Sequence, residues 1–223
     1  MPFAGDNTRH PLPLLPLRRG VTQLVAKDDS VGILTDAPCR EEKKMKRSNL
    51  ARPFLAQARH LLSQVYFPRI VACLRELSAE QIWWRPNPAS NSVGNLVLHL
   101  EGNVRQWIVS GLGGAPDRRV RDLEFSEAGP ITPRTLLARL RRAVTDAGRV
   151  MGKLDGAALA KTYSIQGFRV TGLRAVFHVT EHFSHHTGQV IQLTKFLSEK
   201  DLKFTHLPRK SERKGKLRGF PAL

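Results

Sequence analysis

Apolar side chains recur three and four residues apart in four stretches of the chain, which is the spacing of one face of an α-helix. These stretches span residues 49–77, 91–110, 132–154 and 171–197. Strand patterns are scarce, and residues 163–170 are expected to form only a short hairpin-like connection. Because longer crossings join the first helix to the second and the third to the fourth, the pattern predicts an all-α four-helix bundle.

Capping residues and prolines support the bounds of these helices. Asn91 or Ser92 can cap the second helix, and a Gly-Leu-Gly-Gly run ends it. Thr132 followed by Pro133 combines a cap with a first-turn proline, which predicts the start of the third helix. Pro68 lies inside the first helix and is expected to kink or loosen its middle, because proline lacks a backbone N–H donor.

The bundle is expected to occupy residues 46–207, with a different composition on either side. Residues 1–45 are rich in proline and irregular, which predicts an extension that is disordered or outside the working protein. Met45 is a plausible translation start, so the sequence leaves open whether residues 1–44 are translated. Residues 208–223 are basic and contain glycine, which is typical of a disordered tail.

Composition and charge exclude several classes of protein. No run of about eighteen apolar residues exists, so a transmembrane helix is excluded, and the proline-broken N-terminus does not resemble a secretory signal. Two cysteines make no disulfide framework, which fits a reducing cytoplasm. The net charge of +17 is dispersed over the chain and accompanies no zinc-finger spacing or aromatic-interleaved strand, so specific nucleic-acid binding is disfavoured.

The stretch HVTEHFSHHTGQV, residues 178–190, contains four of the eight histidines of the chain. On a helix, residues four apart lie one turn apart on the same face, so His182 and His186 can bind one ion together. The pair of His178 and His182 has the same spacing, and spacing alone does not choose between the two pairs. Two ligands are also fewer than a metal site normally needs. The alternative is a polar stripe on an ordinary helix.

A further histidine, His99, lies among leucines and valines in the middle of the second predicted helix. Helical bundles build metal sites from inward-facing side chains of neighbouring helices, so His99 could complete a set of three nitrogens. The alternative is an interior histidine whose hydrogen bonds are satisfied by the protein. Asn95, one turn earlier, shares the face of His99.

Three segments together resemble the DinB-like superfamily, also called YfiT-like, whose members are helical bundles unrelated to the polymerase of the same name. The segments are NSVGNLVLHLEGNVRQWIVSGLGG, HVTEHFSHHTGQVIQLTKFL and the preceding WWRPNPASNSVGNL. The resemblance covers residues 49–204. It implies a four-helix bundle and a divalent metal held by three histidines, one in the second helix and two that lie four residues apart in the last.

Matching this pattern to the chain implies His99, His182 and His186 as the metal ligands. The family's last ligand directly precedes a Thr-Gly-Gln or Arg-Gly-Gln step, which here is the position of His186. His178 and His185 therefore fall outside the implied ligand set.

Three neutral imidazoles would leave positions open on the metal, and a bound ion could activate a water or a thiol. Zinc or nickel is the expected metal. The resemblance implies thiol S-transferase-like or hydrolase chemistry with a low-molecular-weight thiol, and Asn95 and Arg105 are expected to orient an anionic thiol cofactor. A small-molecule substrate and a homodimer are the expected partners. The alternatives are a non-catalytic metal-binding stress-response protein or a basic nucleic-acid or anion binder.

The remaining candidates have structural interpretations. Gln189 is expected either to donate to a water at the site or to bond a neighbouring helix, and Gly188 to permit close helix packing. Cys73 is expected in the core, and Glu181 to point away from the ligands. Three tryptophans are expected to fill an end of the bundle: Trp83, Trp84 and Trp107.

Overall fold

The first predicted helix forms a continuous rod of three pieces in the computed structural model, which describes residues 50–204. The pieces are α2 (Ala51–His60), the π-helical η1 (Leu61–Tyr66) and α3 (Phe67–Arg75). Pro68 lies in the first turn of α3 and cannot donate a backbone N–H. The wider π turn directly precedes this proline, so the expected loosening takes the form of a π-helical insertion and not of a break.

The second helix is α5 (Val93–Val104), which continues into a second π-helical piece, η2 (Arg105–Ser110). Ser92 caps it as one of the two predicted capping residues. The Ser92 hydroxyl accepts from the backbone N–H of Asn95 at 3.1 Å, and the Asn95 side chain accepts from the backbone N–H of Ser92 at 3.1 Å. Every residue of α5 is buried, so this helix lies at the centre of the fold.

The third and fourth long helices begin at threonine caps. Thr132 caps α7 (Pro133–Met151), which confirms the predicted start, and Thr171 caps α9 (Gly172–Ser198). The two elements before α9 are the strands β1 (Thr162–Ile165) and β2 (Phe168–Thr171), which pair antiparallel. Gln166 and Gly167 connect them with φ angles of 53° and 80°, as in a tight two-residue hairpin turn. The hairpin-like connection is therefore confirmed.

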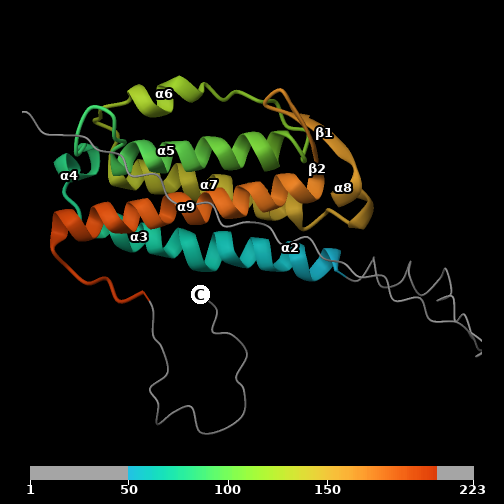
Figure 1. The fold of residues 1–223 in the computed structure, drawn as a ribbon, viewed down its shortest axis with the longest axis horizontal. Coiled ribbons are helices and arrows are strands. Elements are labelled where there is room, and N and C mark those ends of the chain that lie inside the picture. The colour runs from blue at the N-terminus through green and yellow to red at the C-terminus, as the bar shows by residue number, and fades with distance from the viewer. Residues whose placement is uncertain (1–49, 205–223) are drawn as a thin grey trace, which may run out of the picture. The chain divides into compact units, whose positions relative to one another are not determined.

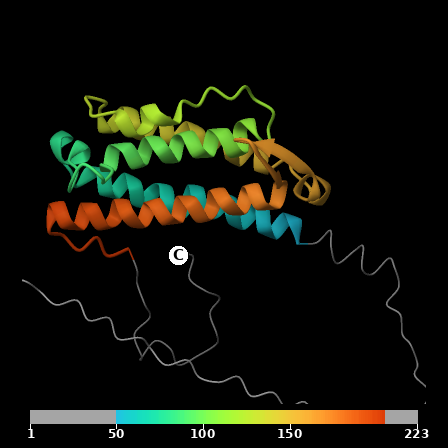
Figure 2. The same ribbon diagram turned by 45° about the horizontal axis from the view of Figure 1, so that its top comes forward.

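The four long rods lie side by side as an all-α bundle, which confirms the predicted fold class (Figure 1). Helix α5 contacts both α7 and α9, and α9 also contacts α3. Figure 2 shows α5 and α9 as neighbours from a second direction. Three short helices complete the fold: α4 (Ala79–Trp83), α6 (Arg121–Ser126) and α8 (Gly156–Ala160). Of these, α6 lies over the outer side of α5.

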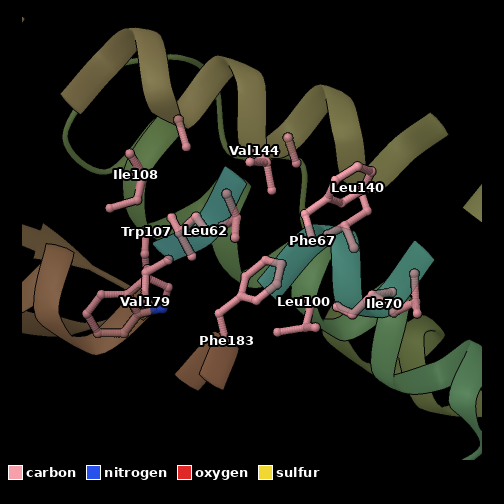
Figure 3. Close-up of a cluster of buried hydrophobic side chains, with 14 of the residues drawn as sticks. Leu62, Phe67, Ile70, Leu100, Trp107, Ile108, Leu140, Val144, Val179 and Phe183 are labelled. Atoms are coloured by element: carbon pink, nitrogen blue, oxygen red, sulfur yellow. The ribbon is translucent and has the colours of Figure 1, made fainter. Parts of the chain in front are cut away.

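The core is a single cluster of apolar side chains contributed by all four rods (Figure 3). Phe183 of α9 is fully buried, and its ring stacks against Tyr66 with centroids 6.1 Å apart. Each such side chain contributes about 1.5–3 kcal/mol when it is removed from water. Cys73 is fully buried in this cluster, as predicted.

None of the helices between residues 50 and 204 combines the length and the apolar character needed to cross a bilayer. The predictions for the extension of residues 1–45, for Met45 as a start and for the tail of residues 208–223 fall outside the described residues.

Replacing Gly94 by alanine is expected to destabilise the bundle. A Cβ atom at this position of α5 would lie 2.7 Å from the Trp83 ring, so the indole must move. We expect a loss of about 1–3 kcal/mol in the free energy of unfolding, measured by urea denaturation.

The matched control is Gly148→Ala in α7, where a Cβ atom would have no neighbour within 4 Å. This change should raise stability by about 0.5–1 kcal/mol, because alanine is the better helix former. Equal effects of the two substitutions would contradict the packing of Trp83 on Gly94.

Candidate metal centre

Three of the histidines come together between the second and fourth long helices. His99 comes from α5, and His182 and His186 come from α9 one turn apart. One ring nitrogen of each residue lies within 4.8 Å of the other two. The closest pair is Nε2 of His99 and Nε2 of His182, which are 2.9 Å apart. The structure thus brings together the three residues that the family resemblance implies as ligands.

The packing of α9 fixes the direction of its two histidines. Val179, Phe183 and Val190 are buried on the face that enters the core (Figure 3 shows Val179 and Phe183). Because His182 and His186 lie beside this apolar face, burying it turns both rings toward α5. His99 is 6% exposed, whereas His182 and His186 are half-buried. Access from solvent is therefore on the α9 side.

A carboxylate from α6 contacts the far side of His99. Oε2 of Glu124 lies 2.9 Å from Nδ1 of His99, and both side chains are buried. Arg119 donates to both oxygens of this carboxylate, from Nε at 2.7 Å and from Nη2 at 2.8 Å. Burial pushes the pKa of Glu124 upward, but the hydrogen bonds from Arg119 and His99 outweigh it and hold the pKa below its ordinary value.

His186 has a partner of its own one turn further along α9. Its Nδ1 lies 2.7 Å from Oε1 of Gln189, an acceptor, so Nδ1 carries the hydrogen and Nε2 is left with a lone pair. Among the described residues, the Gln189 side chain bonds only to histidines of its own helix, and a bond from Gln189 to a water at the site stays a prediction. Gly188 differs from expectation, since a Cβ atom there would meet nothing within 4 Å.

The environment of His182 and His186 favours their neutral form, which is the form that binds metal. Burial, followed by the neighbouring histidines, lowers the pKa of His182 to about 3. Burial also lowers the pKa of His186. Two nitrogens bound to one zinc-like ion lie about 3.0–3.4 Å apart if each is about 2.0–2.1 Å from it. The observed 2.9 Å between His99 and His182 is close to that separation, so these two donors fit such an ion, and the nitrogen of His186 lies within 4.8 Å of both.

The other two histidines of the cluster lie beside the three. The His178 ring stacks on His182 with centroids 5.3 Å apart and contacts Trp107 at 4.2 Å. His185 is exposed, with its ring 5.0 Å from that of His186. Trp107 therefore lies next to the histidines, and not only at an end of the bundle.

The structure places Asn95 and Arg105 away from each other. Asn95 is fully buried, and its amide donates to the backbone oxygens of Glu124 at 3.0 Å and Glu127 at 2.7 Å. Arg105 donates to Glu101 at 2.6 Å and lines a groove of about 570 Å³ between α5, α7 and the chain around α6. Asn95 thus anchors the chain around α6, residues 119–127, which we call the α6 segment. A thiol contact by either residue stays a prediction.

Sequence reasoning missed Glu124 and Arg119, because they lie in a short helix and its approach without a long apolar period. Gly102 is the one indication in the sequence. It follows His99 by three residues, on the same side of α5, and a Cβ atom there would collide with the Glu124 carboxylate. A glycine within a buried helix can mark the close approach of another group.

The fold is that of DinB-like bundle proteins. Two solved structures share the fold. One is a DinB-like protein, YjoA, from Bacillus subtilis, with 17% identity, a TM-score of 0.50 and coverage of 66% of this chain and 95% of its own. The other is a conserved protein from Enterococcus faecalis, with 13% identity, a TM-score of 0.51 and coverage of 69% and 98%.

The chain belongs to the family described as "Protein of unknown function (DUF1572)", whose model matches residues 49–211. This family is DinB/YfiT-like, so the resemblance predicted from the sequence is confirmed. No curated protein matches the chain significantly.

The stability of the metal-free protein should fall as the pH drops below about 6.5. The pKa of His182 is about 3 in the folded protein and 6.5 in an ordinary environment. Below pH 6.5 the unfolded chain therefore binds a proton at His182, whereas the folded protein keeps this side chain neutral. The contribution is complete above pH 6.5 and is lost progressively toward pH 3. Melting temperatures between pH 7.5 and about 5 measure it.

His182→Gln should flatten this decline, because the variant has no proton to gain at that position. His185→Gln is the matched control, since His185 is an exposed histidine of the same helix. An equal pH dependence in wild type and His182→Gln would contradict the burial of a neutral His182.

Proposed function

We propose that this chain binds one divalent transition metal, zinc or nickel, through His99, His182 and His186. The observation that carries the proposal is the convergence of one ring nitrogen from each residue within 4.8 Å. The hydrogen bonds of His99 with Glu124 and of His186 with Gln189 support it, because both use Nδ1 and leave Nε2 for an ion. Metal-ligating histidines almost always have such a partner.

We further propose that the site is catalytic and acts on a small molecule. Three protein ligands leave positions open, which is typical of catalytic metal sites. A bound divalent ion would lower the pKa of a coordinated water or low-molecular-weight thiol and supply a nucleophile at neutral pH. The proposed reaction is therefore a thiol S-transferase-like transfer to an electrophilic substrate, with hydrolysis as the equivalent reaction of water.

Aromatic side chains border the histidines and give the proposed site an apolar wall. The Phe125 ring lies 4.8 Å from that of His99, and the Arg121 guanidinium lies 4.8 Å above the Phe125 ring. On the other side, Trp107 contacts His178. These rings would exclude water from the reacting atoms, and Arg121 offers a positive charge for an anionic group on the thiol or on the substrate.

The metal assignment predicts a clear division among five alanine variants. Wild-type protein purified without chelators should contain one ion per chain by elemental analysis. His99→Ala, His182→Ala and His186→Ala should each lose it, because two ligands hold an ion poorly. His178→Ala and His185→Ala are matched controls from the same stretch and should keep most of it. Loss in His178→Ala equal to that in His182→Ala would refute the assignment.

The catalytic assignment predicts thiol consumption that requires the metal. Zinc- or nickel-loaded protein should deplete bacillithiol, mycothiol or glutathione in the presence of an electrophile. The metal-free protein and His182→Ala should not. Bound metal without depletion of any thiol would favour the non-catalytic metal-binding protein instead.

A further inference from the structure

The α6 segment holds a buried carboxylate against the ligand that comes from α5. We propose that Glu124, held by Arg119, is a positioning residue that fixes the tautomer of His99 and thereby directs its Nε2 to the metal. The inference rests on the proposed metal site. It adds to that site two residues, Glu124 and Arg119, which lie outside the four long helices.

The first step is the choice of tautomer at His99. Its Nδ1 faces two groups, Oε2 of Glu124 at 2.9 Å and Nη2 of Arg119 at 3.2 Å. The carboxylate can only accept, whereas the guanidinium can only donate. The Arg119 Nη2 already donates to Glu124 at 2.8 Å. The shorter, charge-assisted bond from His99 Nδ1 to the carboxylate therefore determines the tautomer of His99. Nδ1 therefore carries the hydrogen, and Nε2 presents a lone pair.

The second step is the rigidity of the carboxylate itself. The Arg119 side chain is 4% exposed and donates to both oxygens of Glu124. Its remaining nitrogen, Nη1, donates to Oε1 of Gln106 at 2.9 Å, so the guanidinium is itself held by η2. A carboxylate bound on two sides by a planar guanidinium has little rotational freedom. The hydrogen bond from Nδ1 to this fixed carboxylate in turn fixes the orientation of the His99 ring.

The third step is the attachment of α6 to the bundle. Asn95 lies one turn before His99 and donates to the backbone oxygens of Glu124 and Glu127. Its own oxygen accepts from Ser92, so the amide cannot turn over without losing bonds at both ends. Asn95 thus positions the backbone that carries Glu124. Gly102 leaves the space into which the carboxylate enters.

The experiment compares Glu124→Gln with Glu101→Gln. Glu101 is the matched control: it is a buried carboxylate on α5 that is paired with Arg105 and Arg139, at 2.6 Å and 2.9 Å, away from the three histidines. Glu124→Gln should weaken zinc binding about 10- to 100-fold in a chelator competition. Glu101→Gln should stay within about twofold of wild type, even if both variants lose similar stability in urea.

Nitrogen-15 NMR of the histidine rings reports the tautomer of His99, which would not change if Glu124 only stabilised the fold. In metal-free wild type and in Glu101→Gln, the neutral His99 ring should carry its hydrogen on Nδ1. In Glu124→Gln the Nε2–H form should appear, because the amide can present its NH₂ to Nδ1. A wild-type His99 with its hydrogen on Nε2 would overturn the proposal, even if the variant failed to fold.

The two proposals fail in different ways. If wild type binds no zinc but shows the Nδ1–H form that depends on Glu124, the proposed metal function is wrong and the positioning of His99 holds. If wild type binds zinc and Glu124→Gln binds it as tightly, the metal function holds and Glu124 is not a positioning residue.

Discussion

The ion pair of Glu124 with Arg119, completed by a hydrogen bond from His99, is the interaction on which the packing of the α6 segment over α5 depends. A carboxylate removed from water is costly unless it is paired and hydrogen-bonded. Here the Glu124 side chain is 9% exposed, and both of its oxygens have partners. Removing either Glu124 or Arg119 would leave the charge of the other uncompensated inside the protein. The α6 segment and the histidine cluster are therefore parts of one structure that forms together.

This constraint explains why α5 has no polar, solvent-facing side. A helix of a small bundle usually exposes the face opposite the core. In this protein the α6 segment covers that face, and all twelve residues of α5 are buried. The polar residues of α5 are accordingly used in bonds: Asn95 with the α6 backbone, His99 with Glu124, and Glu101 with Arg105 and Arg139.

The sequence predicted the four long helices well because an apolar period is a local property. The role of α6 was not predicted, because Glu124 and His99 are 25 residues apart in the sequence and no short-range pattern indicates a contact between them. The two π-helical pieces were also missed, because a single wide turn hardly changes the three-and-four spacing. For the candidate site, spacing left two histidine pairs open. Resemblance to the family chose His182 and His186, and the structure brings these two together with His99.

The three histidines differ in how firmly their rings are held, and this difference sets how the cluster could accept an ion. Glu124 holds His99 and Gln189 holds His186, each through Nδ1. With a lone pair on Nε2 of His99, the 2.9 Å contact to Nε2 of His182 requires the hydrogen to lie on His182.

An ion bound at this point would replace that hydrogen, so His182 would have to move its proton to Nδ1. His182 is half-buried, which gives its ring access to water for this exchange. The cluster therefore combines two histidines that are fixed by hydrogen bonds with one that can change its tautomer. A site of this kind can be preorganised for an ion and still be held together by a hydrogen bond when the ion is absent.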